Sequence, residues 1–195
     1  MRFRSLALAL VLAIGGVGHA MAATAFSNDF SAGIGPSEYV YGAFSTGNGS
    51  VGTQGPYDNN ALGAYGFTAN LQGYTQATLT YNYDVGTEPC CDYFRVYAAA
   101  NPLMLMDSTL IASYSGNQAG TASIDISKYA SNATAVLFRF TSDGSVTGKG
   151  VSISGLSVSG GMGAGVPAPI AGAGLPLLAG LGLAWVRRRR AARAA

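Results

Sequence analysis

Apolar and polar residues alternate along the chain from residue 77 to residue 158, which is the pattern of β-strands with one buried face. In the first run, Leu79, Tyr81 and Tyr83 fall on one face, and threonine, asparagine and aspartate fall on the other. No helical period of similar strength occurs between residues 24 and 160. The pattern therefore predicts an all-β domain, an antiparallel β-sandwich or jelly roll. Strands are predicted at residues 77–84, 92–98, 109–114, 121–126, 134–141 and 150–158.

The last predicted strand changes parity within its length. Val151 and Ile153 share one face, but Leu156 and Val158 continue after an odd step at Ser154-Gly155. A β-bulge accounts for such a step, and glycine suits it. The alternative is that the strand ends at Ile153.

Residues 24–75 show a weaker pattern, with Gly/Asn/Ser-rich stretches at 48–55 and 58–60 that predict long loops. We place the β-sandwich domain at residues 24–158. The glycines of residues 159–165 predict a flexible tether after it.

The N-terminal residues 1–23 have the three parts of a secretory signal peptide. Arg2 and Arg4 precede an apolar run at residues 6–17, and Ala20-Met21-Ala22 forms a small-x-small cleavage site. We therefore expect export through the Sec translocon and cleavage by signal peptidase. A permanent anchor is the alternative, but the apolar run is too short to cross a bilayer.

The C-terminal residues 166–195 also have three parts. A short motif is followed by an apolar stretch at residues 170–186, which as a helix would cover about 26 Å, the short end of what spans a bilayer. A basic cluster follows, and the positive-inside rule keeps it cytoplasmic, so the chain before it would lie outside. The motif is Val166, Pro167, Ala168 and Pro169, and the basic cluster is Arg187, Arg188, Arg189 and Arg190.

This tail resembles the PEP-CTERM sorting signal of Gram-negative bacteria that make exopolysaccharide. The family has a Pro-Glu-Pro motif, a transmembrane helix and terminal arginines, and this chain departs from it by carrying Ala168 in place of glutamate. The resemblance implies sorting by an exosortase-type membrane protease. It also implies an inner-membrane precursor that ends at the cell surface or in the extracellular matrix. An ordinary anchor that is never cut is the alternative.

Charge is distributed unevenly between the targeting segments and the exported body. The whole chain carries +2, but residues 24–165 hold four basic residues against nine carboxylates, a net charge of −5. An acidic, lysine-poor body argues against nucleic-acid binding, which needs basic patches.

The two cysteines are adjacent, Cys90 and Cys91, in a chain predicted to enter an oxidising compartment. A bond between neighbours is constrained, because their Cα atoms lie about 3.8 Å apart. A vicinal disulfide, which Pro89 and the surrounding turn favour, an intermolecular bridge and free thiols remain open. A metal site is disfavoured, because two adjacent thiols without histidine make a poor tetrahedral ligand set.

The region from residue 76 to residue 158 also resembles the CUB and MAM-like jelly-roll domains of secreted proteins, through the runs at 79–81, 92–97, 125–130 and 137–150. In such domains the closing strand often ends in paired aspartates that help hold the fold or a calcium ion. Ser154 and Gly155 stand there instead, which argues against a calcium site built on that pair. Calcium bound elsewhere stays open, and no other cofactor is expected.

Catalysis is restricted by what the exported body lacks. The single histidine, His19, lies in the predicted signal peptide, which excludes histidine-based triads and histidine-ligated zinc from the body. A two-carboxylate glycoside hydrolase remains formally open. We expect a protein that is not an enzyme.

Binding fits the composition better, because jelly rolls often bind sugars through exposed aromatic side chains beside amides and carboxylates. The sequence therefore predicts a surface or matrix protein, associated with exopolysaccharide as a binding module, with a purely structural coat protein as the alternative. Loop packing or a second buried face would explain the same residues without a ligand. The two candidate clusters are Tyr57, Asp58, Asn59 and Asn60 on a predicted loop, and Tyr93, Arg95 and Tyr97 on a predicted strand.

Overall fold

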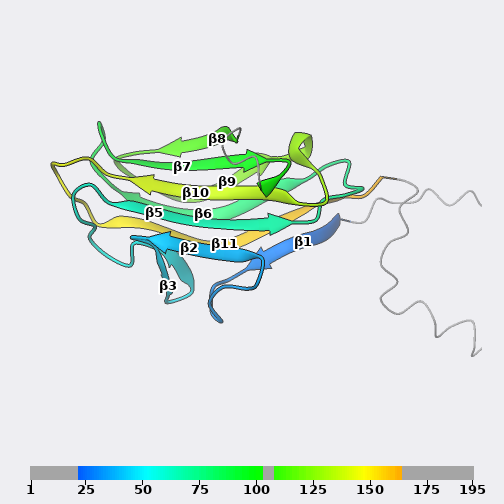
Figure 1. Cartoon of the computed structure of the whole chain (residues 1–195), viewed down its shortest axis with the longest axis horizontal. Coiled ribbons are helices and arrows are strands. Elements are labelled where there is room, and N and C mark those ends of the chain that lie inside the picture. Colours follow the sequence, from blue (N-terminus) through cyan, green and yellow to red (C-terminus); the bar gives the residue numbers. More distant parts are fainter. Residues whose placement is uncertain (1–21, 103–107, 164–195) are drawn as a thin grey trace, which may run out of the picture. The chain divides into compact units, whose positions relative to one another are not determined.

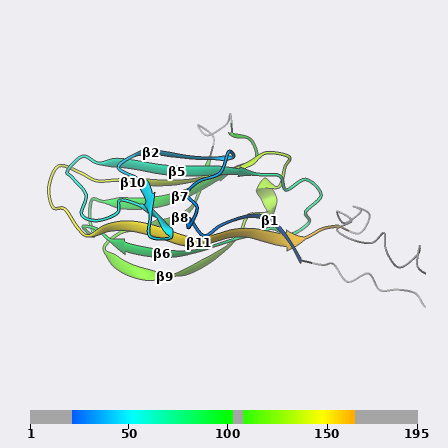
Figure 2. The ribbon, with the colours of Figure 1, turned by 90° about the horizontal axis from the view of Figure 1, so that it is seen from below.

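The computed structural model describes residues 22–102 and 108–163, which form two facing antiparallel sheets (Figures 1 and 2). The six-stranded sheet has the order β3-β4-β11-β6-β9, with β1 also paired to β11, and the five-stranded sheet has the order β2-β5-β10-β7-β8. The predicted all-β class with antiparallel sheets is confirmed.

The first half of the domain contributes five strands. They are β1 (Ala22–Asn28), β2 (Glu38–Gly42), β3 (Ser45–Gly47), β4 (Ser50–Gly52) and β5 (Leu62–Ala69). The prediction of long loops at residues 48–55 is wrong at β4, which pairs with Ser152 and Ile153 of β11. Gly52 allows this pairing, because a Cβ there would lie 1.9 Å from the Val151 carbonyl oxygen.

The second half contributes β6 (Thr78–Gly86), β7 (Tyr93–Ala99), β8 (Thr109–Tyr114), β9 (Asn117–Asp125), β10 (Thr134–Thr141) and β11 (Gly150–Gly161). Each corresponds to one predicted strand. A short 3-10 turn, Ser127–Tyr129, joins β9 to β10. β11 runs past the expected boundary at residue 158, because its last residues pair with β1 as far as Ala22–Gly161.

The β-bulge predicted in β11 is confirmed. The pairing of β11 with β6 shifts register between Ser154 and Ser157, and Gly155 takes a φ of +57°. The shift turns Leu156 and Val158 to the same side as Ile153, and all three side chains are buried.

The core lies between the sheets and is rich in aromatic side chains. Tyr65 and Phe138 of the five-stranded sheet are fully buried, as are Leu79 and Tyr81 of the six-stranded sheet. The ring of Tyr81 meets Phe138 edge-on, with the ring centroids 5.0 Å apart. The alternation predicted for Leu79, Tyr81 and Tyr83 is therefore confirmed, since these residues face the core or pack against it.

None of the helical segments within residues 22–102 and 108–163 is long and apolar enough to cross a membrane. The predicted signal peptide, except for Ala22 and Ala23 at the start of β1, lies outside the described residues. The sorting motif, the apolar stretch at 170–186 and the arginine cluster lie outside them as well.

Candidate functional site

The outer side of the five-stranded sheet carries exposed tyrosine and arginine side chains. The inward residues of each strand enter the core, so the alternate residues must point outward. In β7, Phe94 and Val96 are fully buried while Tyr93, Arg95 and Tyr97 are half-buried. We call this surface the tyrosine–arginine face, and it consists of Tyr39, Tyr41, Tyr93, Arg95, Tyr97, Leu110, Leu137 and Arg139.

Strand register arranges all of the face except Tyr93, which pairs with Thr141, in two rows across all five strands. The first row runs Tyr39, Gly66, Leu137, Tyr97 and Leu110, each residue being the Cα partner of the next. Tyr39 is 42% exposed and Leu110 is 48% exposed, so both ends of the row are open to solvent.

The second row runs Tyr41, Ala64, Arg139, Arg95 and Ser113. Tyr41 is the most exposed tyrosine in the face, at 63%. Ala64 separates Tyr41 from Arg139 with a short side chain, at neighbouring strands spaced about 4.8 Å apart. The row therefore presents an aromatic ring at one end and two guanidinium groups beyond it.

Gly66 explains how Tyr39 is held on this face. A Cβ at Gly66 would meet the Tyr39 ring at 2.3 Å, so the ring lies across the glycine. Burial raises the pKa of Tyr39 above its usual value, because the phenolate would be poorly solvated there. The absence of a side chain at Gly66 thus makes room for an aromatic ring lying over β5.

Of the predicted strand cluster, the structure places Tyr93, Arg95 and Tyr97 together on the outer face of β7. The guanidinium carbon of Arg95 lies 4.2 Å from the centroid of the Tyr93 ring. These side chains do not enter a second buried interface within the described sandwich. Sequence reasoning missed Tyr39, Tyr41, Leu110 and Arg139, whose position on the same face depends on pairing between strands far apart in sequence.

The predicted loop cluster is arranged differently from the expectation. Tyr57 is 5% exposed, and its ring packs edge-on against Phe140 with centroids 4.8 Å apart. Its hydroxyl donates to the fully buried carboxylate of Asp92. The prediction that Tyr57 is an exposed aromatic residue for sugar binding is therefore wrong. Its hydroxyl bonds to a buried carboxylate, and this places the side chain inside the domain.

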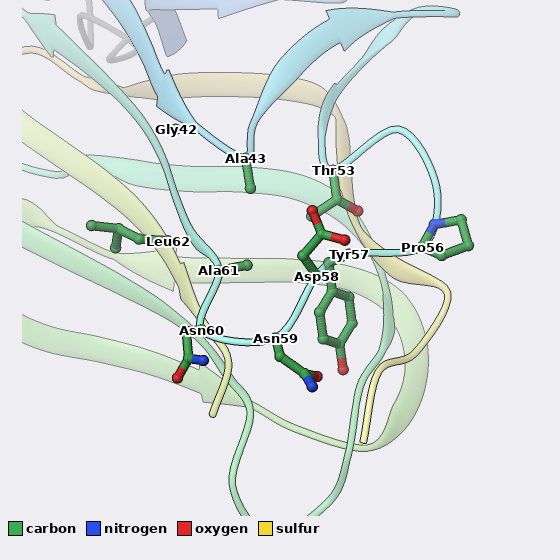
Figure 3. Close-up of a pocket in the computed structure, with 10 residues that line it drawn as sticks. All are labelled: Gly42, Ala43, Thr53, Pro56, Tyr57, Asp58, Asn59, Asn60, Ala61 and Leu62. Carbon is green, nitrogen blue, oxygen red and sulfur yellow. The ribbon is translucent and has the colours of Figure 1, made fainter. Parts of the chain in front are cut away.

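The neighbouring residues remain at the surface. Figure 3 shows the carboxylate of Asp58 on the side of Thr53, while the Tyr57 ring and the Asn59 amide point the other way. The Asn59 side chain donates to the Gly144 carbonyl at 3.1 Å, and the Asn60 backbone N–H donates to the backbone carbonyl of Asp143. An open hollow of about 490 Å³ is lined by residues 42–43, 53 and 56–62.

Three carboxylates gather beside Tyr57, with one oxygen each from Glu88, Asp92 and Asp143 lying within 4.8 Å of the others. Asp92 accepts the Tyr57 hydroxyl and, at 2.9 Å, the Asp143 backbone N–H. Calcium prefers such oxygen ligands. Both oxygens of Asp92 are nevertheless engaged within the protein, so these contacts explain the cluster and we assign no metal to it.

The same cluster bears on glycoside hydrolysis. The Ser145 backbone N–H and hydroxyl donate to Asp143 at 2.9 and 2.8 Å and lower the pKa of that carboxyl. Retaining glycosidases need two carboxyl groups about 5–5.5 Å apart, one of them with a raised pKa. A lowered pKa at Asp143 is the opposite of what a general acid requires.

Cys90 and Cys91 form a vicinal disulfide, with their Cα atoms 3.7 Å apart. The Tyr93 hydroxyl donates to the Cys90 carbonyl at 2.6 Å, and the Ser115 hydroxyl donates to the Pro89 carbonyl at 2.7 Å. The disulfide therefore sits in a turn between β6 and β7 that side chains hold from both sides. Because both sulfurs are oxidised, neither is a thiolate that could bind a metal.

Comparison with known proteins shows the fold. No protein-family model matches this sequence, and no curated protein sequence matches it. The K3 cleaved adhesin domain of Lys-gingipain from Porphyromonas gingivalis W83 is similar, with a TM-score of 0.53 at 15% identity, over 72% of this chain and 100% of that chain. The K1 cleaved adhesin domain of the same protein has a TM-score of 0.50 at 13% identity, over 70% of this chain and 97% of that chain.

A family 29 carbohydrate-binding module, a CBM29-2 mutant solved with mannohexaose, has a TM-score of 0.48 at 16% identity, over 73% of this chain and 94% of that chain. Taken together, the adhesin-domain similarities establish a shared β-sandwich fold.

Proposed function

We propose that this protein is an exported, envelope-sorted surface or matrix protein that works as a polysaccharide-associated binding module and not as an enzyme. The observation that carries the proposal is the tyrosine–arginine face. Tyr39 and Tyr41 expose aromatic rings on an ordered sheet, and Leu137 and Tyr97 continue the surface across it. Exposed aromatic side chains that gather on one face of a protein commonly mark a binding surface.

The chemistry of tyrosine supports a carbohydrate ligand. A tyrosine presents an apolar ring face and a polar hydroxyl, so it can pack against the C–H face of a sugar and bond to its hydroxyls. The rings lie on β-strands rather than on loops, and this limits the conformational entropy lost on binding. A repeating polymer suits a row that spans five strands.

The sorting part of the proposal rests on the predicted signal peptide and on the resemblance of residues 166–195 to PEP-CTERM tails. Both imply a route from the Sec translocon through signal peptidase to an exosortase-type protease. A surface address of this kind places the tyrosine–arginine face where exopolysaccharide is found.

Binding of the full chain, purified in mild detergent, to the exopolysaccharide of the producing cells tests the proposal. We expect saturable binding that falls in Tyr41→Ala. Ile34→Ala is the matched control, because Ile34 is an exposed apolar residue, 42% exposed, outside the face. Equal binding by both variants would place the site elsewhere, and no binding by the wild-type chain would favour the purely structural coat.

A further inference from the structure

Half of the basic residues of the exported body lie on the tyrosine–arginine face. Residues 24–165 hold four cations, and Arg95 and Arg139 are two of them. Lys149 is paired with Asp84, with its ammonium 2.6 Å from a carboxylate oxygen, and Lys128 lies over the Tyr129 ring. In a body of net charge −5, this face therefore concentrates positive charge.

The two arginines are also placed against each other. Arg95 of β7 and Arg139 of β10 are direct Cα partners. Like charges directly opposite one another on a sheet are destabilising. In residues 22–102 and 108–163 the Lys149–Asp84 pair is the only ion pair, so no carboxylate in this part of the chain relieves the arginine pair.

The outward residues of the described strands around the pair carry no negative charge. The outward residues of the five strands, from Tyr39 on β2 to Leu110 on β8, include no aspartate or glutamate. Glu38, the acidic residue of β2, faces the other way and accepts from Asn28 at 2.8 Å. A negative group from a ligand would therefore meet two cations and no repelling carboxylate on the sheet.

The guanidinium of Arg95 is held beside an aromatic ring. Its carbon lies 4.2 Å from the centroid of the Tyr93 ring, a cation–π contact that helps to keep the group in place. A planar guanidinium matches a carboxylate through two parallel hydrogen bonds. Arg139 is exposed on the adjacent strand, so one carboxylate can be reached from both.

We propose that the tyrosine–arginine face binds an acidic polysaccharide, with Arg95 and Arg139 holding the carboxylate of a uronic acid while Tyr41 and Tyr39 pack against neighbouring sugar rings. This inference rests on the proposed function and adds the class of ligand to it. Two opposed arginines cost the free domain stability, and a bound carboxylate removes that cost. The face is in this way selective for charged over neutral chains.

The test is affinity of the full chain, in mild detergent, for polygalacturonate and for the same polymer with its carboxyl groups methyl-esterified. We expect binding to the free acid at least tenfold tighter, and weaker binding as sodium chloride is raised. Arg95→Gln combined with Arg139→Gln should remove that preference and leave the thermal transition unchanged or higher. Lys128→Gln combined with Lys149→Gln is the control, because it also removes two positive charges, outside this face, and should change affinity less than twofold.

The outcomes separate the inference from the proposed function. If the chain binds the acid and the ester with equal affinity, the inference of an acidic ligand is overturned, and the proposal of a carbohydrate-binding module still stands. Acid binding that persists in the double arginine variant would overturn the assigned residues. If the chain bound neither polymer nor the exopolysaccharide of the producing cells, the proposed function would fail together with the inference.

Discussion

The contact between Tyr57 and Asp92 makes a quantitative prediction for Tyr57→Phe. Asp92 is 0% exposed, and its carboxylate accepts the Tyr57 hydroxyl and the Asp143 backbone N–H. The substitution keeps the ring and its edge contact with Phe140 but removes the hydroxyl. A hydrogen bond to a charged group contributes about 1.5–3 kcal/mol, and the substitution would leave one oxygen of the buried carboxylate without its hydrogen-bond donor.

We therefore expect Tyr57→Phe to lower the free energy of unfolding by about 1.5–3 kcal/mol. For a domain of this size the corresponding fall in Tm is roughly 5 to 12 °C. Urea unfolding and differential scanning calorimetry of the full chain measure both quantities.

Tyr41→Phe is the matched control, because it removes the hydroxyl of a tyrosine that is 63% exposed. It should change the free energy of unfolding by less than about 0.5 kcal/mol. The reasoning is refuted if the two variants unfold alike, since the buried Asp92 would then draw no stability from Tyr57.

Three further predictions concern pH, the disulfide and the tail. Burial and the neighbouring Asp92 raise the pKa of Tyr57 to about 12, so native stability should hold below pH 10 and fall as pH rises from 10 towards 12, measured by chemical unfolding at each pH; Tyr57→Phe should make that fall shallower without abolishing it, because burial also raises the pKa of Tyr65 and Tyr81. Cys90→Ser should leave the domain folded with a cooperative thermal transition, because a bond between adjacent residues closes no long loop; loss of the transition would contradict this. Deletion of residues 166–195 should redirect the protein to the periplasm or medium, as followed by fractionation and immunoblotting, whereas an unchanged location would count against sorting.

The strands of the second half could be predicted from sequence because their alternation is strict. Phe94 and Val96 are buried while Arg95 between them is half-buried, as their order along the chain indicates. The β11 bulge was also visible, since the parity change before Leu156 has few other causes. Such signals are local, and each strand carries its own.

The strands of the first half could not be predicted from the sequence, because they carry glycine at positions where a residue distant in sequence fills the space of a side chain. Gly63 and Gly66 of β5 lie against the rings of Phe44 and Tyr39, and a Cβ at either would meet a ring atom at 2.3 Å. In sequence these glycines resemble a loop. Their role depends on a partner that only the fold identifies.

The candidate site was partly predicted for a related reason. Tyr93, Arg95 and Tyr97 share a face by period alone, so sequence identifies them together. Arg139 joins them only through the pairing of β10 with β7, and Tyr41 only through β5. Tyr57 was misjudged because its burial depends on Asp92, 35 residues later in the chain.

The most direct test of the account is a titration of the wild-type full chain and of Gly66→Ala with the exopolysaccharide of the producing cells. The added methyl group would displace the Tyr39 ring from β5, and alanine is acceptable to a strand at this position because Gly66 does not take a positive φ. The account predicts saturable binding by the wild-type chain and clearly weaker binding by Gly66→Ala at a similar Tm. Undiminished binding by Gly66→Ala would contradict the assignment of the tyrosine–arginine face as the binding surface.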